Sequence, residues 1–109
     1  MDAASKKLYQ MKAEVIAAAA HPVRLAILDC LRDGERCVCD IAVRVGSRRP
    51  NVSRHLAVML KAGLVQCRKD GLKVIYSLKT CCVLGFADCV TDVLRHQARQ
   101  TASLLKRLK

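Results

Sequence analysis

The sequence predicts a mainly α-helical fold with one small β-hairpin, and three observations lead to that prediction. Apolar residues recur at helical spacing through most of the chain. One stretch, residues 64–78, changes to a strand-like pattern on either side of Asp70-Gly71, a strong hairpin signal. The length of 109 residues suits one compact domain and is too short for two. We therefore expect a single domain over residues 1–109.

Two helices are expected before residue 34. Ser5 to Ala20 is rich in alanine, and His21-Pro22 interrupts it, with the proline well placed in the first turn of the next helix. That second helix is expected to run to about Arg32 and to end at Asp33-Gly34. Its inward face carries three apolar residues at helical spacing: Val23, Ile27 and Leu31.

The centre of the chain predicts a helix-turn-helix. A short helix is expected over about Val38 to Val45, followed by a turn at Gly46 and a longer helix over about Arg49 to Ala62. Gly63 stands where a left-handed C-cap residue belongs. The inward residues of the longer helix are expected to be Val52, Leu56, Met59 and Leu60.

A hairpin and a last helix complete the pattern. The runs LVQCRK and LKVIYSL predict two strands, with Asp70-Gly71 as the turn because both central positions of such a turn favour positive φ. Val83 to Leu108 predicts a long helix, whose apolar residues include Leu84, Val90, Leu94, Leu104 and Leu105. The order helix, helix, helix-turn-helix, hairpin, helix is that of a winged helix-turn-helix.

Charge and the missing motifs narrow the function. Twenty Lys and Arg against nine Asp and Glu give a net charge of +11, which favours a polyanionic partner such as nucleic acid. We find no phosphate-binding loop, dinucleotide fingerprint or nucleophile-base pair, so we expect no enzyme. No apolar run approaches the roughly 20 residues of a membrane span. The N-terminus shows no apolar signal region, so we expect a cytoplasmic protein.

Four strings carry a resemblance to a known family: AHPVRLAIL (20–28), CVCDIA (37–42), NVSRHLAVMLKAGLV (51–65) and KVIYSL (73–78). Together they resemble the ArsR/SmtB family of metal-responsive bacterial repressors over nearly the whole chain. The resemblance implies a homodimer packed through its first and last helices. It also implies a repressor that leaves double-stranded operator DNA when a metal or metalloid binds, with no organic cofactor.

The expected DNA contacts lie at the start of the recognition helix and on the hairpin. The recognition helix carries Arg48, Arg49, Asn51, Ser53, Arg54 and His55. Arginine suits guanine and asparagine suits adenine in the major groove, although His55 could instead support helix packing. Arg68, Lys69 and Lys73 flank the hairpin turn, where they would touch phosphates without determining sequence. Family members usually have a capping Ser or Thr at Arg48, so Ser47 is the expected cap here.

Seven cysteines suggest a sensing function, because thiols stay reduced in a cytosol and clustered cysteines then bind metals or respond to oxidation. Cys37 and Cys39 match the thiol pair of arsenite-responsive family members, which typically have a third cysteine where this chain has Ala42. Cys81, Cys82 and Cys89 resemble the C-terminal three-cysteine site of other members and are our first choice. As(III) or Sb(III), which favours three thiolates, is the expected inducer.

Geometry restricts the first choice. Seven helical residues rise about 10.5 Å, so the three sulfurs meet only if the chain before Val83 folds back or a partner subunit supplies a thiol. The other cysteines, Cys30 and Cys67, are expected to be packing residues.

Other functions stay open. The same repressor could sense persulfide or oxidants, or Cd(II), Pb(II) or Hg(II). A thiol oxidoreductase or a metal-sequestering protein is less favoured, because the chain has Cys-x-Cys and not the Cys-x-x-Cys of redox enzymes.

Overall fold

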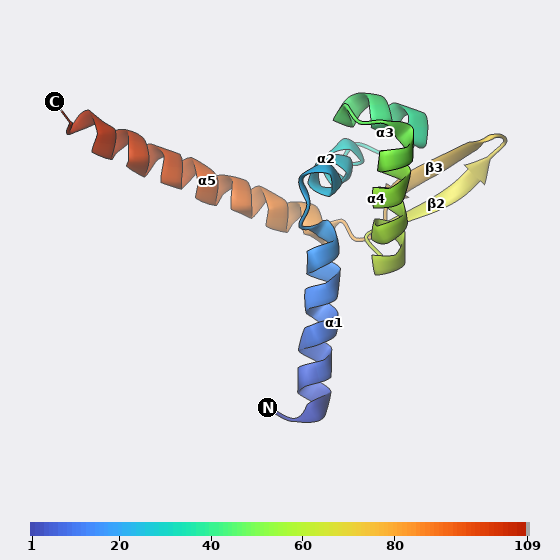
Figure 1. The fold of residues 1–109 in the computed structure, drawn as a ribbon, viewed down its shortest axis with the longest axis horizontal. Coiled ribbons are helices and arrows are strands. Elements are labelled where there is room, and N and C mark those ends of the chain that lie inside the picture. The colour runs from blue at the N-terminus through green and yellow to red at the C-terminus, as the bar shows by residue number, and fades with distance from the viewer. Residues whose placement is uncertain (109) are drawn as a thin grey trace.

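The computed structural model describes residues 1–108 and shows a central folded unit from which two long helices project (Figure 1). Its overall extents are 62 × 45 × 22 Å. The elements in chain order are α1 (Ala3–Ala19), α2 (Pro22–Cys30), β1 (Arg36–Cys37), α3 (Val38–Val45), α4 (Arg49–Ala62), β2 (Val65–Asp70), β3 (Lys73–Leu78) and α5 (Cys82–Lys106). We call residues 21–80 the DNA-binding unit and α1 and α5 the two arms.

The core lies inside the DNA-binding unit, where α2, α3 and α4 meet. The fully buried side chains are Ile27, Leu28, Leu31, Ile41, Val52, Leu56, Met59, Leu64 and Val65. The predicted apolar faces of α2 and α4 therefore supply most of this core. Of the other predicted inward residues, Val23 is half-buried against this core, whereas Leu60 is 39% exposed. It lies about 100° around the helix from the buried Met59, so the expectation that both point inward was wrong.

Local sequence signals set the helix ends. Asp2 caps α1 by accepting a hydrogen bond from the Ser5 amide at 2.7 Å. Gly46 and Gly63 end α3 and α4 in the left-handed region, with φ of 68° and 83°, as expected of C-cap glycines. The bounds of α3 and α4 agree with the sequence prediction, whereas α2 ends at Cys30, two residues before the predicted end.

The sheet has three antiparallel strands in the order β1-β3-β2. The two-residue strand β1 was not predicted; it pairs Arg36 with Tyr76 and Cys37 with Ile75. Asp70 pairs with Lys73, so the turn residues are Gly71 and Leu72 and not Asp70 and Gly71 as predicted. Only Gly71 of the two has positive φ, at 62°, which fits a turn with glycine in its first central position.

The arms bury little of their apolar surface. In α1 the buried residues are Ala18 and Ala19, and in α5 the buried residue is Leu84. Large apolar side chains along the rest of both helices are exposed, among them Leu8, Met11, Ile16, Val90, Leu94, Leu104 and Leu105. Within residues 1–108, no helix is both long and apolar enough to cross a membrane.

Candidate nucleic-acid interface and thiol sites

The α3–turn–α4 segment presents the start of α4 to the outside. Ile41 and Ala42 bury the inner face of α3, and Val52 and Leu56 bury the inner face of α4. Pro50 lies in the first turn of α4, where its missing amide hydrogen costs nothing. The residues expected to contact DNA here that are exposed are Arg48, Arg49, Ser53 and Arg54. Three guanidinium groups thus surround one helix start.

Ser47 does not cap α4. Arg48 is the N-cap residue, and no side chain accepts a capping hydrogen bond there. Instead the Ser47 hydroxyl accepts a 2.8 Å hydrogen bond from the Asn51 side-chain amide. The Asn51 carbonyl oxygen in turn accepts a 3.4 Å bond from Arg54. The expected cap is therefore wrong, and the serine orients a candidate base-contacting residue.

His55 lies in the packing between α2 and α4, the alternative to DNA contact that the sequence left open. Its Nδ1 accepts a 3.1 Å hydrogen bond from Arg24, and its ring lies 4.4 Å from the ring of His21. Burial, together with the positive charge of Arg24 and the neighbouring His21, holds the pKa of His55 below its usual range. His21 itself caps α2 by accepting from the Val23 amide.

The wing, formed by β2 and β3, carries its three candidate cations in different settings. Lys69 and Lys73 are exposed near the turn. The Arg68 guanidinium instead forms a two-pronged ion pair with Glu35, which precedes β1, and lies 3.8 Å from the Asp70 carboxylate. This pairing lowers the pKa of Glu35. The two carboxylates partly neutralise Arg68 and so reduce its attraction for a phosphate. The sequence could not indicate this pairing, because Glu35 lies 33 residues away.

The seven cysteines are all free thiols. Cys81, Cys82 and Cys89 are exposed. Cys81 is the N-cap of α5 with helical backbone angles, φ −70° and ψ −23°, so the chain does not fold back before Val83. Among residues 1–108, no group of three or more Cys, His, Asp or Glu side chains is gathered closely enough to hold a metal ion. A single chain in this conformation therefore does not assemble the first-choice site.

The second-choice pair lies where β1 meets α3. Cys37 is half-buried and is both the last residue of β1 and the N-cap of α3, whereas Cys39 is exposed in the first turn of the helix. The Arg36 guanidinium donates to the Cys30 carbonyl oxygen and to Asp40, and it lowers the pKa of the Asp40 carboxyl. The missing third ligand position, Ala42, is buried.

Of the two cysteines expected to pack, one does so. Cys30 packs against the core, and burial raises the pKa of its thiol. Cys67 is exposed on β2, so the packing expectation for it was wrong. Strand alternation alone could not decide this, because β2 buries Val65 and exposes every later residue.

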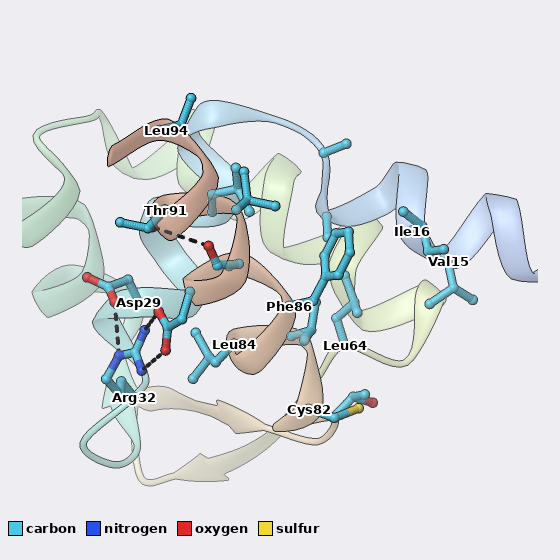
Figure 2. A pocket seen from close by; sticks show the side chains of 18 residues that line it. Val15, Ile16, Asp29, Arg32, Leu64, Cys82, Leu84, Phe86, Thr91 and Leu94 are labelled. Carbon is cyan, nitrogen blue, oxygen red and sulfur yellow. Dashed lines mark hydrogen bonds and ion pairs between the residues drawn. The ribbon is translucent and has the colours of Figure 1, made fainter. Parts of the chain in front are cut away.

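An apolar groove of about 650 Å³ runs between the arms and α2. Figure 2 shows Ile16 of α1 and Phe86 and Leu94 of α5 along it, with Leu84 and Leu64 at its base. Its polar lining includes the ion pair between Arg32 and Asp88, and Cys82 lies at one end.

Comparison with known proteins supports this geometry. The model of bacterial regulatory proteins of the arsR family matches residues 21–66. The arsenical resistance operon repressor of Escherichia coli K12 is 31% identical over 90 residues, 82% of this chain and 77% of that protein. This chain belongs to the ArsR family.

Solved relatives agree in fold. The homodimeric winged helix-turn-helix DNA-binding domain of Mb0332 from Mycobacterium bovis is a possible ArsR-family transcriptional regulator. It has 30% identity and a TM-score of 0.78, covering 88% of this chain and 93% of that one. Rv0081 of Mycobacterium tuberculosis has 32% identity and a TM-score of 0.74, covering 87% and 96% of the two chains.

The chain spans about two thirds of the length of the curated relatives that it matches. The curated Rv0081 sequence, an uncharacterized HTH-type transcriptional regulator from strain H37Rv, is 40% identical over 75 residues, 68% of this chain and 66% of that protein. The expected winged helix-turn-helix is confirmed, and these ArsR relatives are named as transcriptional regulators.

Proposed function

We propose that this ArsR-family protein is a dimeric, cytoplasmic repressor that leaves its operator when As(III) or Sb(III) binds its cysteine thiolates. The observation that carries the proposal is that α5 combines an exposed apolar stripe with exposed thiols. The helix presents an unpartnered apolar stripe and, at its start, three exposed thiols. A ligand of those thiols would therefore act on the helix that joins two copies.

The DNA-binding half rests on the exposed start of α4. Arg49 and Arg54 lie there with Asn51 and Ser53, and the exposed wing lysines Lys69 and Lys73 lie on a second element. A helix in the major groove with a flanking hairpin on phosphates is the way winged helices use these elements. Two copies related by a two-fold axis would bind a roughly palindromic operator.

The apolar arms support the dimer. Val90, Leu94 and Leu105 are 42%, 59% and 58% exposed in one chain, and Leu8 and Met11 of α1 are similarly open. Contiguous exposed apolar surface of this kind marks an interface. We assign the partner to a second copy, as in the homodimeric Mb0332 domain.

The inducer is proposed from thiol chemistry. As(III) favours three thiolates, and Cys82 and Cys89 lie seven residues apart on the same face of α5. One chain does not bring three thiols together, so the third thiolate would come from a rearranged Cys81 or from the second copy. The pair Cys37 and Cys39, with one partly open thiol and one exposed, is the second-choice site.

A second candidate inducer is a persulfide or an oxidant. Five of the seven free thiols are exposed, which makes them accessible to such reagents. Cd(II), Pb(II) and Hg(II) also favour thiolates and belong in the same assays.

The test begins with an operator selected from randomised DNA by the wild-type protein. Release of that DNA is then titrated with arsenite for two double variants, Cys81→Ser/Cys82→Ser and Cys37→Ser/Cys39→Ser. We expect the first to need a much higher arsenite concentration for release and the second to resemble the wild type. If both variants release DNA at the wild-type concentration, neither cluster is essential and the proposed inducer site is wrong. Parallel titrations with polysulfide and Cd(II), followed by intact mass, separate the other inducers.

A further inference from the structure

Besides the packing of Leu84, two polar contacts fix the base of the α5 arm: one comes from its second turn and one from the residues just before the helix. Beyond residue 94 the large side chains of α5 are exposed, so no packing within residues 1–108 holds the distal half. The near half packs on α2 through the buried Leu84. Whatever fixes the direction of α5 must therefore act between residues 79 and 90.

The first attachment is an ion pair between Arg32 and Asp88. Arg32 lies in the turn after α2, and its two terminal nitrogens donate to the two Asp88 oxygens at 3.1 and 2.9 Å. Its Nε donates to Asp29 at 3.0 Å, so carboxylates hold the guanidinium group at two of its edges (Figure 2). A planar two-pronged pair fixes direction as well as distance, unlike a contact between two flexible charges. The arrangement lowers the pKa of Asp88.

The second attachment holds the segment just before α5 against the end of the recognition helix. The Thr80 hydroxyl donates to the carbonyl oxygen of Gly63, the C-cap residue of α4, at 2.8 Å. The backbone amide of Lys79 donates to the carbonyl oxygen of Leu64 at 3.1 Å. A rotation of α5 about its first turn would therefore act directly on the α4–β2 junction.

The candidate thiols lie next to these two attachments. Cys81 and Cys82 follow Thr80, and Cys89 follows Asp88. A ligand that drew Cys82 and Cys89 toward a common centre would strain two neighbouring contacts. These are the hydrogen bond from Thr80 to Gly63 and the ion pair between Arg32 and Asp88. Thiols elsewhere on α5 would have no such connection to the DNA-binding unit.

We propose that Arg32 and Asp88 are the positioning residues through which the direction of α5 controls DNA binding, with Thr80–Gly63 as the fixed pivot. In a dimer joined through the arms, the angle between α5 and the DNA-binding unit sets the separation of the two recognition helices. Half-site spacing follows from that separation. The inference rests on the proposed dimeric, thiol-sensing function and names the contacts that transmit it.

The experiment uses the full chain and a charge exchange. The variants are Arg32→Asp, Asp88→Arg and the two combined. For each we measure arsenite bound per chain, and separately the ratio of operator Kd with and without saturating arsenite. We expect the wild-type ratio to lie between about 5 and 150. The single variants should bind arsenite as the wild type does and give a ratio near one, and the combined variant should recover the wild-type ratio to within about threefold.

A matched control is present within α5. Arg95 and Asp92 form an ion pair at 3.4 Å, but both belong to the same helix and connect no second element. Exchanging them should leave the ratio unchanged. For the pivot, Thr80→Val should reduce the ratio, whereas Thr91→Val, which removes a hydroxyl bonded to Ala87 within α5, should not. Single exchange variants with the wild-type ratio would overturn the proposal, as would an equal loss in the Arg95/Asp92 control.

A measurement without arsenite distinguishes an error in the proposed inducer from an error in this inference. Operators whose half-sites are moved apart or together by a base pair are compared with the selected one. The wild type should discriminate between them, the single exchange variants should lose that discrimination, and the combined variant should regain it. If wild-type protein selects no two-fold site, residual dipolar couplings decide the point in the free protein: an unchanged direction of α5 in both single variants overturns the inference.

Discussion

The DNA-binding unit and the two arms differ in how completely one chain folds them. In residues 21–80 the apolar side chains converge, with Ile27, Leu56 and Met59 fully buried. In α1 and α5 the apolar stripes are as regular in sequence, yet Leu94 and Leu105 remain more than half exposed. Helical spacing therefore predicts an apolar face in both regions, and only tertiary packing tells whether that face is covered within one chain.

The largest contrast is expected from equivalent leucine truncations in α4. Leu56→Ala should lower the free energy of unfolding by about 3 kcal/mol, because it leaves a cavity in the core. Leu60→Ala, on the exposed side of the same helix, should cost no more than about 0.5 kcal/mol. Urea unfolding at one fixed protein concentration measures both. Equal losses would mean that the burial pattern of α4 is wrong.

The arms are tested by charging their exposed stripe. Leu94→Glu should weaken dimerisation by about 2 kcal/mol or more, because a carboxylate would be buried in an apolar interface. Leu72→Glu, at the fully exposed wing tip, is the control and should leave the dimer intact. Sedimentation equilibrium gives the dimer Kd for each. A Leu94 variant that dimerises normally would place the interface elsewhere.

Within the DNA-binding unit, helix and wing should fail in different ways. Arg49→Ala should cost about 1–3 kcal/mol and relax the preference for one base pair. Lys73→Ala should weaken all sequences alike and reduce the salt slope of binding by about one. Binding to the selected operator and to single-base variants over a salt series separates the two effects. A uniform loss in the Arg49 variant would assign that residue to phosphate.

A smaller effect is expected from the pair on the wing. Because Glu35 neutralises Arg68, Arg68→Gln should change the salt slope less than Lys73→Ala does. Glu35→Gln should free the guanidinium and strengthen binding at low salt. Parallel salt series on the three proteins decide this, and an Arg68 variant as weak as the Lys73 variant would show that DNA displaces Glu35.

The smallest effect is a dependence of stability on pH. The folded pKa of His55 lies below its unfolded value near 6.5, so the neutral ring favours folding. Its contribution is fully present above pH 6.5 and is lost as the pH falls through the folded pKa. His55→Gln should flatten the melting temperature between pH 7 and pH 5, before the carboxylates titrate. An unchanged pH profile would exclude His55 as the titrating group.

Much of the fold followed from the sequence because its signals are local. Gly46 and Gly63 placed both helix ends of the helix-turn-helix, and the period-2 pattern found the hairpin. What failed was long-range or a matter of a single residue. β1 is two residues long and exists only because β3 pairs with it. The turn lies one residue later than predicted, because Asp70 pairs with Lys73 and Gly71 therefore takes the first turn position.

The site was harder to predict than the fold, since side-chain partners were decisive. Ser47 has the chemistry of a cap and lies next to the cap position, but Asn51 is within its reach and the α4 amides are not bonded to it. Glu35 lies outside the four strings that carry the resemblance, and the string that contains Arg24 gives no sign of its partner. Each modifies a candidate residue from more than 30 positions away. Only the third dimension brings such pairs together.

The strand order β1-β3-β2 has a consequence for handling the protein. It leaves β2 as an open edge over its whole length, with unpaired backbone groups that could template pairing with another chain. Arg68, Lys69 and Asp70 place three consecutive charges on that edge, the usual protection against such pairing. Variants that neutralise two of these at once, however useful for mapping phosphate contacts, should therefore be checked for aggregation before any loss of DNA affinity is attributed to the interface.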